Sequence, residues 1–184
     1  MRPSFKNVQD AVEKRTKQFA PKQYFPLEEI FLKITEETWE VAKEISRLYA
    51  HKRKKGKGSM EHLKLEIGDM LFALCCLWNS QGIDYQKIMD EVDEKDFECT
   101  PDESPIRLFN AVAQQVHAVM AEISHIMNFN YSTLKTNWLK EKIKLALLST
   151  CRLGNSQGID LNNAVADAIK KFDGRLEEEE KKKE

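Results

Sequence analysis

Five acidic side chains in the first half of the chain have the spacing of a metal site. Glu36, Glu37 and Glu40 form one group, and Glu66 and Asp69 form a second after 25 intervening residues. Residues three and four apart share one face of an α-helix, so each group projects its carboxylates together. Carboxylates that converge from two adjacent helices repel one another and are costly to bury. A divalent cation that accepts all-oxygen ligands, Mg²⁺ or Mn²⁺, offsets that cost.

The residues around the acids indicate that both groups border a hydrophobic core. The first helix has an apolar arc over residues 34–48, with Glu37 and Glu40 at its edges. The second helix is apolar nearly all round over residues 67–78, which is typical of a helix buried in a bundle. Asp69 lies inside that run. A glutamate-rich helix face is usually solvated surface, but two acidic pairs that both border apolar faces favour a site.

Composition restricts the class of protein. The chain has 184 residues, of which 41% are hydrophobic and 32% charged, and its net charge of −1 gives no electrostatic argument for nucleic-acid binding. Only seven glycines and five prolines, with long 3.6-residue periodicities, favour an all-α fold. We expect a protein without an export signal or a membrane span. The four cysteines form no Cys-x-x-Cys pair, which disfavours a zinc site and fits a reducing cytoplasm.

Capping residues and breaks divide the first half into helices. The sequence predicts helices over residues 5–19 and 26–50, a third that starts after Ser59 and ends before Gly82, and a fourth over residues 85–97. The basic, glycine-broken loop at residues 51–57 connects the two acidic helices. It is either a solvated turn or a source of cations near a bound polyphosphate, and the sequence leaves both readings open.

The second half repeats the first. Residues 155–160 reproduce residues 79–84 letter for letter at an offset of 76, and residues 109–126 follow residues 31–48 at an offset of 78. An identical hexapeptide inside a longer match indicates an internal duplication. The second copy keeps the helical pattern and loses the acids, because the aligned positions hold Gln114, Gln115, Ala118, Lys142 and Leu145.

The duplication leads to a prediction of the domains and the fold class. We expect a repeat with the acidic metal site at residues 1–99, a linker at 100–105, a degenerate repeat at 106–175 and a charged tail at 176–184. The predicted fold is an all-α helical bundle in which the two tandem repeats pack as a pseudo-dimer. Two such chains could pair again, as a dimer of fused pseudo-dimers.

The acidic motifs, with Gly68-Asp69-Met70-Leu71-Phe72 and Gly82-Ile83-Asp84, closely resemble those of the MazG-like nucleotide pyrophosphohydrolases. These belong to the superfamily of all-α NTP pyrophosphatases. The resemblance covers residues 5–97, and more weakly 106–175. It implies Mg²⁺-dependent hydrolysis of a nucleoside triphosphate to the monophosphate and pyrophosphate, with nucleotide-pool house-cleaning as a role.

The resemblance also assigns residues to roles. It implies that Mg²⁺, or Mn²⁺ in its place, binds to four carboxylates: Glu37, Glu40, Glu66 and Asp69. Glu36 would be the catalytic residue, as a further ligand or as the group that orients the water. The basic residues that correspond to phosphate-binding positions on the family's last helix are Lys95, Lys171 and Arg175. The expected partner is the nucleotide, without a membrane or a specific nucleic acid, and the base stays open.

Three other classes of function compete with this prediction. The first is a catalytically weak regulatory or scaffold module derived from the same family, against which the retained acids argue. The second is a di-iron bundle, because Glu122 and His125 have Glu-x-x-His spacing. That fold requires two such motifs, and only one is present. The third is nucleic-acid binding, which only the basic loop at residues 51–57 favours.

Overall fold

The computed structural model describes residues 9–14, 26–50, 58–83, 91–100, 103–129 and 136–181. Within these ranges, the side chains of residues 128–129, 136–137 and 175–181 are outside the description. The basic loop at residues 51–57 and residues 84–90 also lie outside it. All regular structure in the described ranges is helical, which confirms the all-α prediction. No helix in these ranges is long and apolar enough to cross a bilayer.

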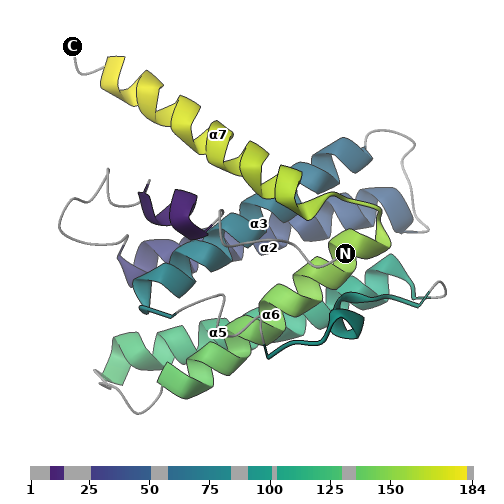
Figure 1. Cartoon of the computed structure of the whole chain (residues 1–184), viewed down its shortest axis with the longest axis horizontal. Helices are drawn as coiled ribbons and strands as arrows, with labels where there is room; N and C mark the ends of the chain where they lie inside the picture. The colour runs from purple at the N-terminus through teal and green to yellow at the C-terminus, as the bar shows by residue number, and fades with distance from the viewer. Residues whose placement is uncertain are drawn as a thin grey trace.

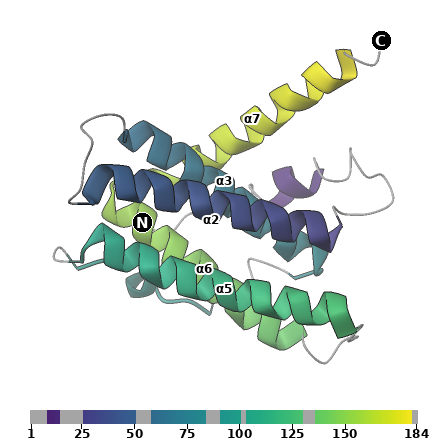
Figure 2. The same cartoon turned by 180° about the vertical axis from the view of Figure 1, so that it is seen from behind.

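The bundle is built from two helical hairpins and a crossing helix. The first hairpin pairs α2 (Leu27–Tyr49) with α3 (Met60–Ser80). The second pairs α5 (Pro105–Phe129) with α6 (Thr136–Ser156), and α2 packs on α5. The last helix, α7 (Leu161–Lys181), packs across α3, and its C-terminal end projects away from the hairpins (Figures 1 and 2).

Capping residues fix the ends of the acidic helices as the sequence predicts. Pro26 directly precedes α2, and the Ser59 hydroxyl accepts a hydrogen bond of 3.0 Å from the backbone N–H of His62 at the start of α3. Gly82, after α3, has a φ of 63°, and Gly158, after α6, has a φ of 67°. Such positive φ values favour glycine. The two glycines belong to the identical hexapeptides, so both hairpins end in the same way.

The helix predicted over residues 85–97 is wrong in its described part. Residues 91–93 form a turn and a bend, followed by a single 3₁₀ turn, η1 (Glu94–Phe97). The cause is a capping box: the side chain of Asp93 accepts from the Asp96 backbone, and the side chain of Asp96 accepts from the backbone N–H of Asp93. This local pattern starts a new turn at Asp93.

α3 forms the centre of the core. It contacts α2, α6 and α7, and its side chains from residue 67 to residue 79 are all buried. Cys75 and Cys76 pack there as hydrophobic residues, and burial raises the pKa of the Cys75 thiol to about 12. Cys151 of α6 is buried as well.

The two hairpins share a pattern of contacts that is consistent with the predicted duplication. The side-chain amide of Asn79 donates to the carbonyl of Gln9 at 3.4 Å, and that of Asn155 donates to the carbonyl of Phe97 at 3.0 Å. Each bond joins the C-terminal part of a hairpin's second helix to a segment that lies outside that hairpin. The domain boundaries themselves stay a prediction.

α7 can cross α3 closely because residue 68 has no side chain. A Cβ at Gly68 would lie 2.3 Å from the carbonyl oxygen of Ala164, well inside contact distance. One turn away from this crossing, Lys64 Nζ contacts Asp167 at 2.9 Å. The close crossing brings α7, from the second half of the chain, to the acidic face of the first half.

Candidate metal centre

Three of the predicted acids meet between α2 and α3. Glu37 comes from α2, whereas Glu66 and Asp69 come from α3. Each of the three residues has one carboxylate oxygen within 4.8 Å of those of the other two. Glu37 is 2% exposed and Asp69 is 8% exposed, while Glu66 is partly buried. The hairpin brings them together because the α3 pair lies on one face, three residues apart, and that face packs on α2.

Burial and mutual repulsion make the cluster unfavourable for bare anions. Burial raises the pKa of Glu37, and the charge of Asp69 adds to that shift, while Lys33 opposes it. Burial likewise raises the pKa of Glu66, with further contributions from the charges of Asp69 and Glu40. Each shift means that the folded protein disfavours the charged carboxylate. A cation at this position would relieve that cost.

The donor set fits a hard divalent cation. All three groups offer oxygen, which Mg²⁺ and Mn²⁺ prefer. Ligand oxygens around octahedral Mg²⁺ lie about 3 Å apart when adjacent and about 4 Å apart when opposite, from metal–oxygen distances of about 2.1 Å. The observed limit of 4.8 Å is therefore within a side-chain rotation of a bound geometry.

The two remaining predicted acids lie at the edge of this cluster. Glu40 is about one-third exposed, and its carboxylate contacts Lys43 Nζ at 2.6 Å. Its charge nevertheless acts on Glu66. Glu36 is 63% exposed and contacts Lys33 Nζ at 3.0 Å. The structure thus brings together Glu37, Glu66 and Asp69, and it places Glu40 and Glu36 beside them.

A sixth acid, Glu44, was not predicted. It is 2% exposed and lies on α2, four residues after Glu40, and its charge contributes to the raised pKa of Glu66. One carboxylate oxygen contacts Arg47, and the other is buried without a hydrogen-bond partner. The signal was available in the sequence, because residues 37, 40 and 44 continue one helical face.

Basic side chains reach the cluster from two helices. Lys171 of α7, predicted as a phosphate contact, binds the carboxylate of Asp69. Lys33, which was not predicted, binds Glu37 from one turn earlier in α2. Arg175 follows Lys171 by one turn of α7, and its side chain lies outside the described residues. Lys95 is not at the cluster: it is 73% exposed, pairs with Asp93 at 2.9 Å and lines a cavity beside α6.

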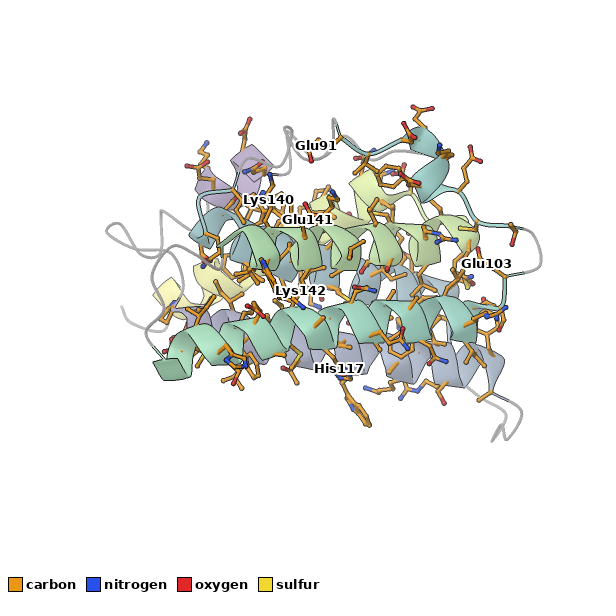
Figure 3. The ribbon with its side chains drawn as sticks, turned by 90° about the horizontal axis from the view of Figure 1, so that it is seen from below. Glu91, Glu103, His117, Lys140, Glu141 and Lys142 are labelled. Atoms are coloured by element: carbon orange, nitrogen blue, oxygen red, sulfur yellow. The ribbon has the colours of Figure 1, made fainter. Side chains whose placement is uncertain are left out.

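That cavity, of about 470 Å³, lies at the equivalent position in the second half. Its lining includes Lys95 and Leu145, which correspond to Lys171 and Asp69 at the same offset of 76. Leu145 is 43% exposed, so the position of the lost acid faces solvent. Lys142, which aligns with Glu66, also lies on α6 (Figure 3). At the two positions that align with Glu66 and Asp69, the second half therefore has no carboxylate.

Comparison with known proteins agrees with the acidic motifs. Residues 25–102, which contain α2, α3 and all the predicted acids, match the MazG nucleotide pyrophosphohydrolase domain. The chain is 35% identical over 92 residues to YpjD, an uncharacterized protein of Bacillus subtilis (strain 168). The matched region covers 50% of this chain and 82% of YpjD. No solved structure matches the chain. With its buried acids in an all-α hairpin, the chain belongs to the MazG nucleotide pyrophosphohydrolase family.

Proposed function

We propose that the protein hydrolyses a nucleoside triphosphate to the monophosphate and pyrophosphate, with Mg²⁺ as its cofactor and Mn²⁺ as a substitute. The observation that carries this proposal is the convergence of Glu37, Glu66 and Asp69 from two helices into a buried cluster. A structural role does not require three acids to share a buried position, because each one is destabilised there.

Each acid has a proposed part in this reaction. Glu37, Glu66 and Asp69 hold the metal, and Glu40 joins them by turning away from Lys43, which leaves the edge of the site open to phosphate oxygens. Bound Mg²⁺ neutralises phosphate charge and lowers the pKa of a water molecule. Glu36, exposed beside Glu37, accepts a hydrogen bond from the attacking water and orients it.

The proposed phosphate contacts come from the second half of the chain. Lys171 already lies at the acids, and Arg175, one turn further along α7, would extend the positive charge along the triphosphate. Lys95 lies at the equivalent position of the other half, so we assign it no contact with substrate at this cluster. A cytoplasmic location and the pairing of two chains remain predictions.

The proposal is tested with purified protein, Mg²⁺ and a panel of common and modified nucleoside triphosphates. We expect release of pyrophosphate from at least one nucleotide and its loss when the metal is chelated. Asp69→Asn should reduce the rate by at least about 100-fold, because it removes a proposed metal ligand. A positive group that stabilises the developing charge of the transition state is worth about that much. Glu61→Gln is the matched control, because Glu61 also lies on α3 but is exposed and outside the cluster. Release of orthophosphate would contradict the mechanism, and no turnover would favour the scaffold alternative.

A further inference from the structure

Two lysines from different helices occupy the acidic cluster. Lys33 Nζ binds a carboxylate oxygen of Glu37, and Lys171 Nζ binds one of Asp69. The acids are almost covered, with side chains 3% and 11% exposed, while the two lysine side chains are 38% and 40% exposed. Each ammonium group therefore enters a buried acidic site from a solvent-accessible stem.

The charges explain why the lysines lie there. Three carboxylates share the cluster, and the two ammonium groups supply most of the compensation that buried anions need. A divalent cation supplies the same two positive charges at one point. The ammonium groups use the oxygens of Glu37 and Asp69 that a metal would need. Metal and lysines are thus alternatives at the same ligands.

We propose that Lys33 and Lys171 are internal counter-ions of the metal-free site, which a divalent cation displaces, and that the released ammonium groups then bind the triphosphate. This inference rests on the proposed function and deepens it. Lysine suits both roles, because its charge sits on a flexible four-carbon stem with three rotatable donors. Lys33 also contacts exposed Glu36 at 3.0 Å, so its ammonium group already lies at the solvent edge of the cluster.

The exchange couples the metal to the nucleotide. With both lysines retained, a bound divalent cation would add two positive charges to a cluster in which the two ammonium groups already balance most of the carboxylate charge. The triphosphate, which is strongly negative, is the partner that restores the balance. Metal binding therefore prepares two cations for phosphate, one from each half of the chain.

The coupling predicts opposite effects of one substitution on two ligands. Lys171→Met and Lys33→Met should tighten the binding of Mn²⁺ alone, because the competing ammonium group is gone. The same variants should weaken the binding of inorganic triphosphate to the Mn²⁺-loaded protein. Coupling between two ligands is typically about 5- to 150-fold, and we expect changes at the lower end of that range for each lysine.

Isothermal titration with Mn²⁺, and then with inorganic triphosphate, measures both effects without depending on turnover or on the base. Lys64→Met is the matched control, because Lys64 also joins α3 to α7, through Asp167 at 2.9 Å, but outside the cluster. It should leave both affinities unchanged. If the wild-type protein binds no Mn²⁺, the proposed function and this inference both fail. If it binds Mn²⁺ and the cluster variants bind it equally or more weakly, only this inference fails.

Thermal unfolding provides a second, independent measurement. A counter-ion is needed only when the metal is absent, so Lys171→Met should lower the melting temperature in the presence of a chelator and leave it unchanged with saturating Mn²⁺. Equal loss under both conditions would show an ordinary packing role for the lysine and overturn the inference.

Discussion

The crossing of α7 over α3 at Gly68 can be tested with one methyl group. In Gly68→Ala, the new Cβ would lie 2.3 Å from the carbonyl oxygen of Ala164 and 2.7 Å from its carbonyl carbon. Both are backbone atoms, so no side chain can turn away, and the helices must separate by about 1 Å to reach ordinary contact. Such overpacking typically costs about 1–3 kcal/mol.

Two other glycines in helices of the same chain provide matched controls. A Cβ at Gly174 on α7 would meet nothing within 4 Å, so Gly174→Ala should gain about 0.5–1 kcal/mol of helix stability. A Cβ at Gly154 on α6 would lie 2.4 Å from the tip of the Leu161 side chain, which can move. The gain in helix propensity is common to all three variants. We therefore expect Gly174→Ala to be the most stable of the three variants, Gly154→Ala the next and Gly68→Ala the least stable.

Thermal and urea unfolding measure this series. The difference between Gly68→Ala and Gly174→Ala isolates the overpacking cost of about 1–3 kcal/mol, at roughly 2–4 °C per kcal/mol for a chain of this size. Gly68→Ala should also lower the rate of hydrolysis, because the displaced α7 moves Lys171 away from Asp69. A displacement of about 1 Å near a site can lower the rate about 100-fold. Equal stability of these two variants would refute the close crossing.

Two further predictions follow from the charges of the cluster. Burial raises the folded pKa of Glu37 and Glu66 above the unfolded value of 4.5, so the stability they contribute to the metal-free protein is fully present below that pH and is lost as the pH rises through the raised values. Thermal unfolding with a chelator should show that the stability of the wild-type protein declines with rising pH and that Glu66→Gln declines less. Parallel stability profiles of the two proteins would contradict the raised pKa of Glu66. Glu44→Gln should raise the melting temperature of the metal-free protein, because it removes a buried charge whose exposed partner, Arg47, contributes little. A lower melting temperature would instead show that Glu44 is a structural anion.

The sequence was sufficient to predict the part of the site that depends on helical periodicity. The burial of Asp69 followed from its place inside the apolar run of α3, and its meeting with Glu37 followed from the pairing of α3 with the amphipathic helix α2. Glu44 could have been found by extending the same face by one turn. Positions along one helix are predictable because 3.6 residues per turn fix which side chains share a face.

The missed features depend on contacts between helices or on local capping. Lys33 reads as a surface residue until Glu37 is known to be buried, and Lys95 and Lys171 have equivalent positions in the repeat. Only the crossing of α7 over α3 distinguishes them, and it brings Lys171 alone to the acids. The turn before η1 was missed because the reciprocal hydrogen bonds of Asp93 and Asp96 override the helical pattern.

The second half should be indispensable to the first, although we expect it to bind no catalytic metal. Four side chains of α5 with no exposed surface, Val112, Val116, Val119 and Ile123, belong to the same core as α3. Burial of each such side chain is worth about 1.5–3 kcal/mol, so exposing part of this surface by separating α5 from α2 would cost a large share of the stability of a typical domain.

A chain that ends at Cys99 should therefore be insoluble or should dimerise through the face of α3 that α6 and α7 cover. It would also lack Lys171, so the dimer should bind triphosphate more weakly than the full chain does. Light scattering and Mn²⁺ titration measure both effects, and the full chain should bind Mn²⁺ at the first half alone. A shortened chain that is a stable monomer with full activity would show that the halves are independent domains and would contradict this prediction.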